Sequence, residues 1–195
     1  MSDTIAITPE HPAETGYYRK LSSADQHLFR DHLLRLDQDA RRARFAMLAS
    51  DAFLRCYAET SFSLGTVIHG YFAGGILRAV AELRPLGDGM SAEAAFSVEP
   101  ELQQTGIGTR LMELTLMAAR NRGCHHILMN CLATNRAMQK LARRFTDDLT
   151  FEMGDVVCQI SSSRPSAFSQ IREQISDLYG FMVSLTEGLK PTGRA

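Results

Sequence analysis

The sequence lacks the features that mark several large classes of protein. Its 21 basic and 22 acidic side chains leave a formal net charge of -1, so it has no broad positive field to attract nucleic acids or anionic membranes. It contains no run of eighteen or more apolar residues, as a membrane-spanning helix would need. We therefore expect neither nucleic acid nor a membrane as a partner.

Targeting and metal-binding signals are also missing. The first thirty residues mix in Asp3, Glu10 and Glu14 and have no apolar core of a signal peptide, so we expect a cytoplasmic protein. Four cysteines lie scattered, without the C-x-x-C pairs of a zinc site or the density of a secreted disulfide scaffold: Cys56, Cys124, Cys131 and Cys158. We expect buried, reduced thiols and no metal.

What the sequence does contain is typical of a compact enzyme domain. Its 195 residues are 45% apolar and 22% charged, enough to build a sizeable core. The most informative stretch is Gln103 to Gly108, Q-Q-T-G-I-G, between the apolar run Ala94 to Val98 and a helical pattern over Thr109 to Arg122. A strand that turns through glycines into a helix presents free N–H groups to an anion, and phosphate is the expected ligand.

Two common phosphate-binding signatures do not fit this turn. A nucleotide-binding P-loop needs Lys-Ser/Thr directly after its last glycine, where this chain has Thr109-Arg110. A dinucleotide fingerprint needs three glycines and an acidic residue about twenty positions on, where Ile127 and Leu128 stand.

The remaining pattern, Gln-x-x-Gly-x-Gly after Val98-Glu99-Pro100, resembles the acetyl-CoA pyrophosphate loop of the GNAT superfamily of N-acyltransferases. A second family element follows: a strand at Ile127 to Leu132, then Asn135 opening a helix towards Phe145. The resemblance covers roughly residues 60 to 160 and is nearest to bacterial protein-lysine acetyltransferases. It implies acetyl-CoA as co-substrate, bound through Phe96, Ser97, Val98, Gln103, Gln104, Thr105, Gly106, Ile107, Gly108, Thr109 and Asn135.

In that family the strand before the loop commonly bulges, so that backbone N–H groups near Phe96, Ser97 or Val98 stabilise the thioester oxygen. The asparagine matched by Asn135 touches the pantetheine arm or orders the open end of the sheet. Arg110 is either a phosphate partner or a solvated side chain, and Gln103 either binds phosphate or caps the turn. Cys131 ends its strand beside the cofactor, but an inert buried thiol is favoured over a nucleophile.

Acyl transfer to an amine needs a base, because a lysine ammonium has a reference pKa of about 10.4 and must lose a proton before its nitrogen can attack. Strand alternation puts Glu93, Ala95 and Ser97 on one face, and the A-E-x-A-x-x-V stretch resembles one in which the glutamate is the base. Glu93 is our first choice for the base, and we favour this role over that of a solvated side chain on an open strand face. Glu82 is the reserve, and either faces the same cavity or pairs with Arg84. His125 and His126 receive no role.

The resemblance has departures. The tyrosine that many members carry as acid for the leaving thiolate is Ala142 here, and Thr146-Asp147 follows Phe145 in place of Gly-Phe. Arg41 to Phe45 resembles loosely an R-x-x-R-F element of lysine acetyltransferases, although a solvated face is favoured for Arg41, Arg42 and Arg44. Tyr57, Tyr71 and Met90 are candidates for an acceptor pocket, with core packing favoured for each.

The predicted fold class is α/β (α+β): a GNAT-like mixed sheet, antiparallel first and crossover-connected later, with a splayed parallel pair ending at Val98 and near Leu132. Expected strands are 17–21, 63–69, 75–84, 92–98, 126–132 and 151–161, with a hairpin at Leu86-Gly87-Asp88-Gly89. One helix is expected to begin at Ser22 or Ser23. Further helices are expected over 39–48, over 51–58 with Asp51 as cap, over 108–121 and over 135–144.

The domain prediction has four parts: a loose arm over residues 1–14, an acyltransferase domain over 15–164, a C-terminal helix over 165–187 and a frayed tail over 188–195. In the helix, apolar residues step by three and four, which favours either packing on its own domain or a homodimer contact: Phe168, Ile171, Ile175, Leu178, Met182 and Leu185. Gly180 predicts a weak point there.

These patterns predict direct acetyl transfer from acetyl-CoA to a primary amine, either a protein lysine or a small molecule. The alternative from a different class is a non-catalytic acetyl-CoA-binding sensor, which Ala142 favours.

Overall fold

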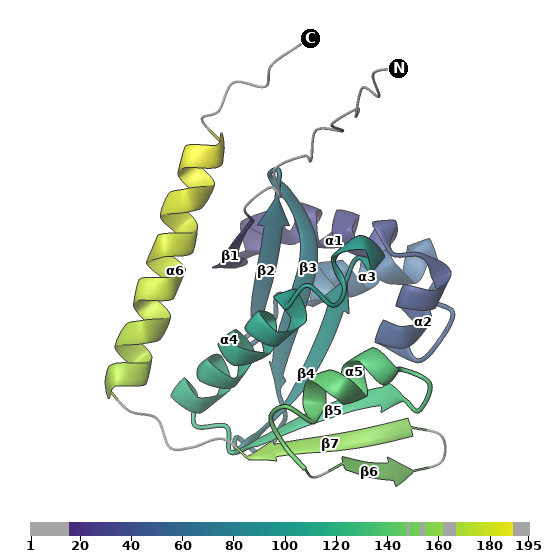
Figure 1. The fold of residues 1–195 in the computed structure, drawn as a ribbon. Coiled ribbons are helices and arrows are strands. Elements are labelled where there is room, and N and C mark those ends of the chain that lie inside the picture. Colours follow the sequence, from purple (N-terminus) through teal and green to yellow (C-terminus); the bar gives the residue numbers. More distant parts are fainter. Residues whose placement is uncertain (1–15, 148, 153–154, 162–166, 189–195) are drawn as a thin grey trace, which may run out of the picture.

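A mixed sheet forms the centre of the structure, a computed structural model that describes residues 16–147, 149–152, 155–161 and 167–188 (Figure 1). Its seven strands lie in the order β1-β2-β3-β4-β5-β7-β6, and only β4 and β5 are parallel neighbours. The strands are β1 Tyr17–Lys20, β2 Val67–Ala73, β3 Ile76–Pro85, β4 Ser91–Val98, β5 His126–Leu132, β6 Leu149–Glu152 and β7 Asp155–Ser161. The predicted mixed sheet with one parallel pair is confirmed.

Helices cover both faces of this sheet. One face carries α1 (Gln26–Arg35), α2 (Gln38–Phe45) and α3 (Asp51–Thr60), and the other carries α4 (Ile107–Asn121) and α5 (Arg136–Ala142) (Figure 1). Buried Phe29, Leu33 and Leu54 pack against the first face, while Leu111 and Met112 of α4 pack against the second. The helices α1, α3 and α4 each bury apolar side chains against the sheet, which is why the chain needs both layers.

Local signals set most helix ends. Asp37 caps α2 by accepting from the Ala40 N–H at 2.7 Å. At α3 the prediction of Asp51 as cap is wrong by one residue, because Ser50 accepts from the Phe53 N–H at 3.2 Å. The expected helix to Leu48 ends earlier, since Ala46 turns left-handed with φ +56°.

Two strand predictions need correction. The expected strand Ser63 to His69 begins only at Val67, because residues 63–66 form a turn closed by the Thr66 N–H on Ser63 O at 3.1 Å. The single strand expected at 151–161 is two antiparallel strands, β6 and β7, paired from Leu149↔Cys158 to Glu152↔Asp155.

The predicted hairpin between β3 and β4 is present. The Asp88 carboxylate accepts from the Met90 and Ser91 N–H groups at 3.0 and 2.8 Å, and Gly89 takes φ +71°.

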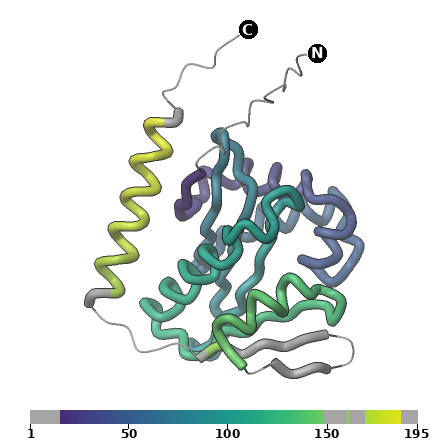
Figure 2. The backbone as a smooth tube through the Cα atoms, viewed as in Figure 1, coloured from purple at the N-terminus to yellow at the C-terminus, as the bar shows by residue number. Residues whose placement is uncertain are grey.

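The C-terminal helix α6 (Ala167–Gly188) stands at the edge of the molecule beside β1 and α4 (Figures 1 and 2). It runs without interruption through Gly180, so the break suggested by that glycine is absent. A Cβ built at Gly180 would lie 2.4 Å from Tyr18 O, so close packing on β1 requires glycine there. The expected arm at 1–14 and the tail after Gly188 lie outside the described residues. None of the described helices combines the length and apolarity needed to cross a membrane.

Candidate active site

The parallel strands β4 and β5 separate part of the way along their length. They pair only from Ser91↔His126 to Glu93↔Leu128, and β4 continues to Val98 while β5 continues to Leu132. Beyond Glu93, in the part of the chain that the structure describes, the edge of β4 has no partner strand on this side. The predicted splay is therefore present, with room for an extended ligand along the β4 edge.

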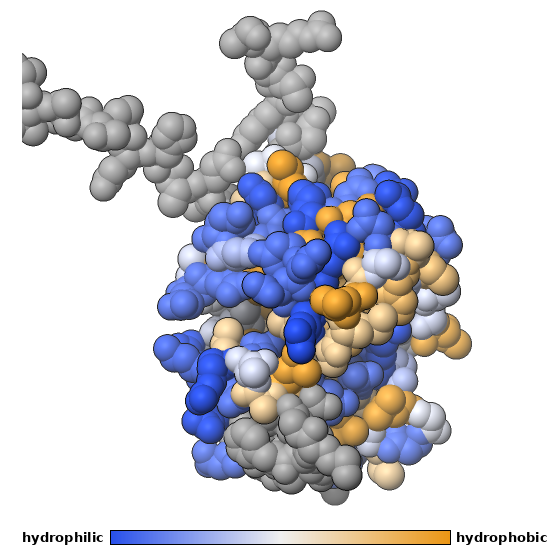
Figure 3. Space-filling model, turned by 90° about the vertical axis from the view of Figure 1, so that its right-hand side faces the viewer, coloured by the Kyte–Doolittle hydropathy of each residue, from blue (hydrophilic) through white to orange (hydrophobic). Residues whose placement is uncertain are grey.

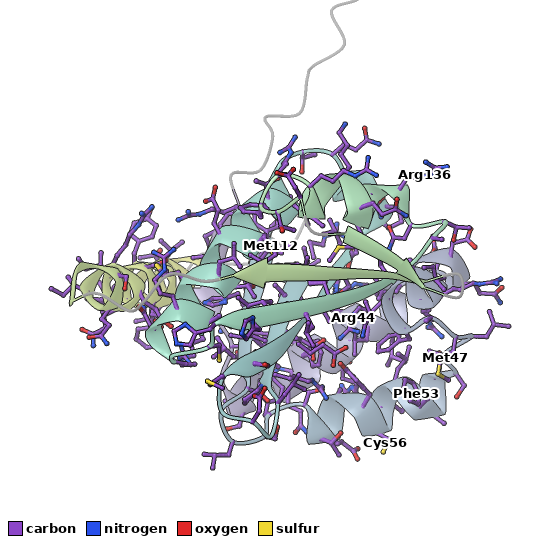
Figure 4. The ribbon with its side chains drawn as sticks, turned by 90° about the horizontal axis from the view of Figure 1, so that it is seen from below. Arg44, Met47, Phe53, Cys56, Met112 and Arg136 are labelled. Atoms are coloured by element: carbon purple, nitrogen blue, oxygen red, sulfur yellow. The ribbon has the colours of Figure 1, made fainter. Side chains whose placement is uncertain are left out.

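A cavity of about 250 Å³ opens at the splay. Both strands and both flanking layers contribute to its wall: Ala43, Arg44, Phe45, Ala46, Tyr57, Arg84, Glu93, Ala94, Ala95, Phe96, Asn130, Cys131, Asn135 and Met138. Figure 4 shows Arg44 directed from α2 towards the sheet, while Met47 in the loop after α2 and Phe53 on α3 lie at the outer edge of the molecule. The wall thus combines charged, polar and apolar side chains, as binding sites usually do.

The glycine-containing turn leads into α4 as expected. Gly106 precedes the helix with φ +92° and Gln104 takes φ +64°, so the chain makes two left-handed steps before Ile107. The first α4 N–H with an acceptor is that of Arg110, which donates to Gly106 O at 3.0 Å. Among the described residues no hydrogen bond takes the N–H groups of Ile107, Gly108 and Thr109, as is usual at a helix start. These groups form a place for an anion.

Side chains around the turn make contacts that bear on the alternatives for Gln103 and Arg110. The Gln103 amide donates to Val98 O at 3.2 Å, which fits the reading that it caps the turn. Arg110 pairs with Glu113 at 2.7 Å on the exposed helix surface. Instead, Arg144 reaches the turn and donates to the Thr109 hydroxyl at 2.9 Å. Sequence reasoning missed Arg144 because it lies 35 residues further along, after α5.

The two candidate carboxylates lie on the same face of the sheet but in different surroundings. Arg84 on β3 is the register partner of Glu93, and Ala95 is the register partner of Glu82. Glu93 is partly exposed and lines the cavity. Glu82 is 1% exposed and is held by two guanidinium groups, those of Arg44 and Arg84. Of the two alternatives for Glu82, pairing with Arg84 is therefore the one observed.

Tyr57 completes this cluster beneath the cavity. Its hydroxyl donates to Glu82 Oε2 at 3.0 Å and accepts from Arg44 Nη2 at 2.6 Å. Burial and the charge of Glu82 raise the pKa of Tyr57 to about 12. The Tyr57 hydroxyl therefore keeps its proton near neutral pH. Tyr57 lines the cavity, unlike Tyr71, which is buried under α4, and Met90, which lies exposed in the hairpin.

A second buried cluster fixes the end of β4. His32 is fully buried, and its Nε2 lies 2.8 Å from Ser97 Oγ while its Nδ1 lies 3.3 Å from Glu99 Oε1. Arg35 also donates to Glu99 at 3.0 Å, and Arg78 pairs with its other oxygen. Burial alone would raise the pKa of Glu99, but the hydrogen bonds from His32 and Arg78 outweigh it and lower the pKa to about 2.

The expected alternation along β4 is observed, but another feature of this strand is corrected. Ser97 is the register partner of Val80 and lies on the face of Glu93, where its side chain meets His32 of α1 and does not line the cavity. The bulge expected in β4 is absent: its register with β3 is continuous from Ala92 to Val98, and the irregularity lies instead in β2 at Tyr71 and Phe72.

The remaining predicted residues have structural contacts of their own. Asn135 caps α5 by accepting from the Met138 N–H at 3.0 Å, and its amide lies 3.5 Å from Ala43 O across the cavity. Ala142 is buried in the core, so its position offers no acid. Cys124 and Cys131 are buried as expected, and Cys131 lines the cavity, but Cys56 is exposed, so the expectation of buried thiols is wrong for that residue. The described residues contain no group of three or more potential metal ligands.

Comparison with known proteins agrees with this geometry. A family model described as acetyltransferase (GNAT) family matches residues 28–146. The GNAT domain of a Streptomyces lividans PAT is 22% identical, with 74% of this chain and 89% of that one covered and a TM-score of 0.62. An acetyltransferase structure from Salmonella typhimurium that contains acetyl-CoA is 17% identical, with coverages of 78% and 96% and a TM-score of 0.57.

A cAMP-binding acyltransferase from Mycobacterium smegmatis is 19% identical, with a TM-score of 0.56. The alignment covers 88% of this chain but only 53% of the mycobacterial protein. At these identities the structural likeness shows the fold alone. No curated protein matches significantly in sequence.

Proposed function

Because the chain belongs to the acetyltransferase (GNAT) family, which uses acetyl-CoA, we propose that it transfers the acetyl group directly to a primary amine with Glu93 as the base. The observation that carries the proposal is the position of Glu93. It lines the cavity at the point where β4 and β5 part, on the strand that leads into the turn at the α4 start. An amine nitrogen in this cavity would meet the thioester beside a carboxylate.

Each part of the site has a role in this proposal. The N–H groups of Ile107, Gly108 and Thr109 bind the diphosphate of acetyl-CoA, with Gln104, Thr105 and Gly106 shaping the turn. The pantetheine arm lies along the edge of β4 past Phe96 and Val98, against Asn135. Glu93 accepts the amine proton as nitrogen attacks the carbonyl carbon, the C–S bond breaks, and the CoA thiolate takes a proton from solvent.

Glu82 is left out of the proton transfer. Its carboxylate is buried and paired with Arg44 and Arg84 and accepts from the Tyr57 hydroxyl, so both of its oxygens are already engaged. We assign this cluster to holding α2 and β3 in position beneath the cavity. Arg44, which sequence patterns placed on a solvated face, thereby becomes a structural residue of the site.

A lysine side chain of a protein is the first candidate for the acceptor, and a small-molecule amine is the second. Cavity-lining Ala46 is followed directly by Met47 and Leu48, which are 45% and 72% exposed, and Phe53 is 37% exposed. Figure 3, which views the molecule from this side, shows apolar side chains among hydrophilic ones. An exposed apolar rim favours contact with a macromolecule over a small polar amine.

The proposal includes two further expectations from the sequence. Cys56 and Cys124, which form no disulfide, fit the reducing cytoplasm as the location. A second copy of the chain, held through α6, is the other proposed partner, because this helix exposes large apolar side chains.

The test combines a CoA thiol-release assay with an acceptor panel: lysine peptides, the same peptides with acetylated lysine, and small alkyl amines. Replacing Glu93 by Gln should lower turnover by about 10²-fold to 10⁴-fold, because the base is lost, while acetyl-CoA affinity changes little. Glu59→Gln, an exposed change on α3, is the matched control and should retain the wild-type rate.

Two outcomes would contradict the proposal. Acetyl-CoA binding without thiol release for any acceptor would favour the sensor function instead. A wild-type rate in Glu93→Gln across the pH range would remove Glu93 from the mechanism.

A further inference from the structure

The helix α6 presents two very different faces. Towards its own domain it places polar or small residues, of which Ser169 and Glu173 are 6% and 7% exposed and Gly180 is buried. Glu173 accepts from Arg122 Nη1 at 2.8 Å and also from Asn121, whose amide oxygen receives the Ser169 hydroxyl. These charged and polar contacts, together with the close approach at Gly180, fix the helix to the domain.

The opposite face of α6 is apolar and open. Seven large apolar side chains of this helix are between 49% and 68% exposed, and they make up half of the fourteen such side chains on the described surface: Ile171, Ile175, Leu178, Tyr179, Phe181, Met182 and Leu185. A surface helix of a monomer normally buries this stripe and exposes the polar one. In α6 the two are reversed.

The exposed residues follow the spacing of a helix–helix seam. Steps of four, three, four and three residues join Ile171, Ile175, Leu178, Met182 and Leu185, which places them at the a and d positions of a heptad. Glu173 and Gly180 then both fall at f, the position opposite the seam, in agreement with their burial against the domain. The sequence pattern and the placement of the helix therefore point to the same outward seam.

Charge along this seam is sparse. Within residues 169–186 the charged side chains are Arg172, Glu173 and Asp177; Glu173 faces the domain and Asp177 is partly buried. Arg172 is the one exposed charge beside the stripe in this part of the helix. Two copies of the face can therefore meet without strong like-charge repulsion.

We infer that α6 is a homodimer contact, in which its apolar seam packs against the same seam of a second copy. A two-fold contact of this kind needs a self-complementary patch, and a heptad stripe is one. Seven side chains that are 49% to 68% exposed leave several hundred Å² of apolar surface, comparable with the roughly 800 Å² per partner of a stable interface.

The position of α6 fits such an assembly. It stands at one edge of the molecule next to β1, whereas the cavity is bounded by α2, β4 and β5 away from that edge (Figures 1 and 4). A dimer through α6 therefore leaves both cavities open to acetyl-CoA and acceptor. The inference goes beyond the proposed acetyl transfer and stands independently of it.

Sedimentation equilibrium of the full chain, from about 1 to about 100 μM, tests the inference. The wild type should be a dimer, and Leu178→Glu should associate about 100-fold or more weakly, because two carboxylates meet at the middle of the seam. Leu64→Glu is the matched control: Leu64 is fully exposed but lies in the loop before β2, so this variant should remain a dimer.

Two variants of opposite charge at Leu178 provide a control for misfolding. Leu178→Glu and Leu178→Lys should each be monomeric and should form a heterodimer when mixed, because Leu178 lies at the centre of the stripe and meets its counterpart in either helix orientation. A monomeric wild type at 100 μM, or a dimer that survives Leu178→Glu, would overturn the inference. The first result would mean that another partner or another segment of this chain covers α6, and the second that the dimer uses a different face.

Discussion

At the scale of single residues, pairing decides which carboxylate is available for chemistry. Glu82 and Glu93 lie on adjacent strands and on the same face of the sheet. Arg44 and Arg84 occupy Glu82, whereas Glu93 faces the cavity. Two residues of the same type, eleven positions apart, thus have different roles because different side chains surround them.

Glu99 gives a prediction at this scale. Its pKa is lowered in the folded protein to about 2, so the ionised carboxylate stabilises the fold above its ordinary pKa of 4.5. This stabilisation should be lost as the pH falls from about 4.5 towards 2, when protonation breaks the contacts with His32, Arg35 and Arg78. Urea unfolding of the wild type and of Glu99→Gln across this range measures the effect.

The variant should be less stable at pH 7, because Arg35 and Arg78 lose a charged partner, and its stability should change less with pH than that of the wild type. Parallel pH profiles for the two proteins would show that Glu99 contributes nothing to the acid response.

At the scale of elements, a substitution in the turn before α4 should abolish cofactor binding while leaving the fold intact. Gly106 has φ +92° and no atom within 4 Å of a built Cβ, so Gly106→Val should cost only about 1 to 2 kcal/mol of stability through backbone strain. Its side chain and altered turn should abolish acetyl-CoA binding measured by calorimetry.

Gly123→Val is the matched control for this change. Gly123 has φ +73° and is equally uncrowded, but it lies at the other end of α4, so the variant should suffer similar strain and bind acetyl-CoA normally. Unchanged affinity in Gly106→Val would remove the turn from the cofactor site.

The attachment of α6 gives a second prediction for elements. A methyl group at Gly180 would lie 2.4 Å from Tyr18 O, so Gly180→Ala should displace the helix from β1 although alanine favours helix formation. Amide hydrogen exchange of α6 should become faster. Gly87→Ala in the β3–β4 hairpin, where a Cβ meets no atom within 4 Å, should leave exchange in α6 unchanged. Equal protection of α6 in all three proteins would contradict this packing.

At the scale of the whole molecule, the site joins two halves of the sheet. The β4–α4 unit supplies the turn and Glu93, while the β5–α5 unit supplies Asn130 and Asn135. A ligand that bridges both should stabilise the native state as a whole. At about 100 times its Kd, acetyl-CoA should add about 2.7 kcal/mol.

This corresponds to a rise in Tm of roughly 5 to 10 °C for a chain of this size. S-acetylpantetheine, which lacks the diphosphate, should give a much smaller rise in a thermal-shift measurement. Equal rises for the two thioesters would show that the α4 turn does not bind phosphate.

The sequence by itself determined the local elements and the family. The Q-x-x-G-x-G turn, the strand at His126 to Leu132 and the Asp-Gly hairpin depend on residues close together in the chain, where glycine conformation and side-chain period act directly. A turn without a strong signal, such as the one before Val67, was missed for the same reason.

Only the tertiary structure decided which side chains meet. Three side-chain contacts of the site join residues that are 35 to 65 positions apart: Arg44 with Glu82, His32 with Ser97, and Arg144 with Thr109. The helix and strand periods of the sequence do not predict such pairs. The outward direction of the α6 seam was likewise undetermined, because a heptad stripe reads the same whether it packs on its own domain or on another chain. The close approach at Gly180 and the polar contacts of Glu173 set that direction, since they bind the opposite face of the helix to the domain.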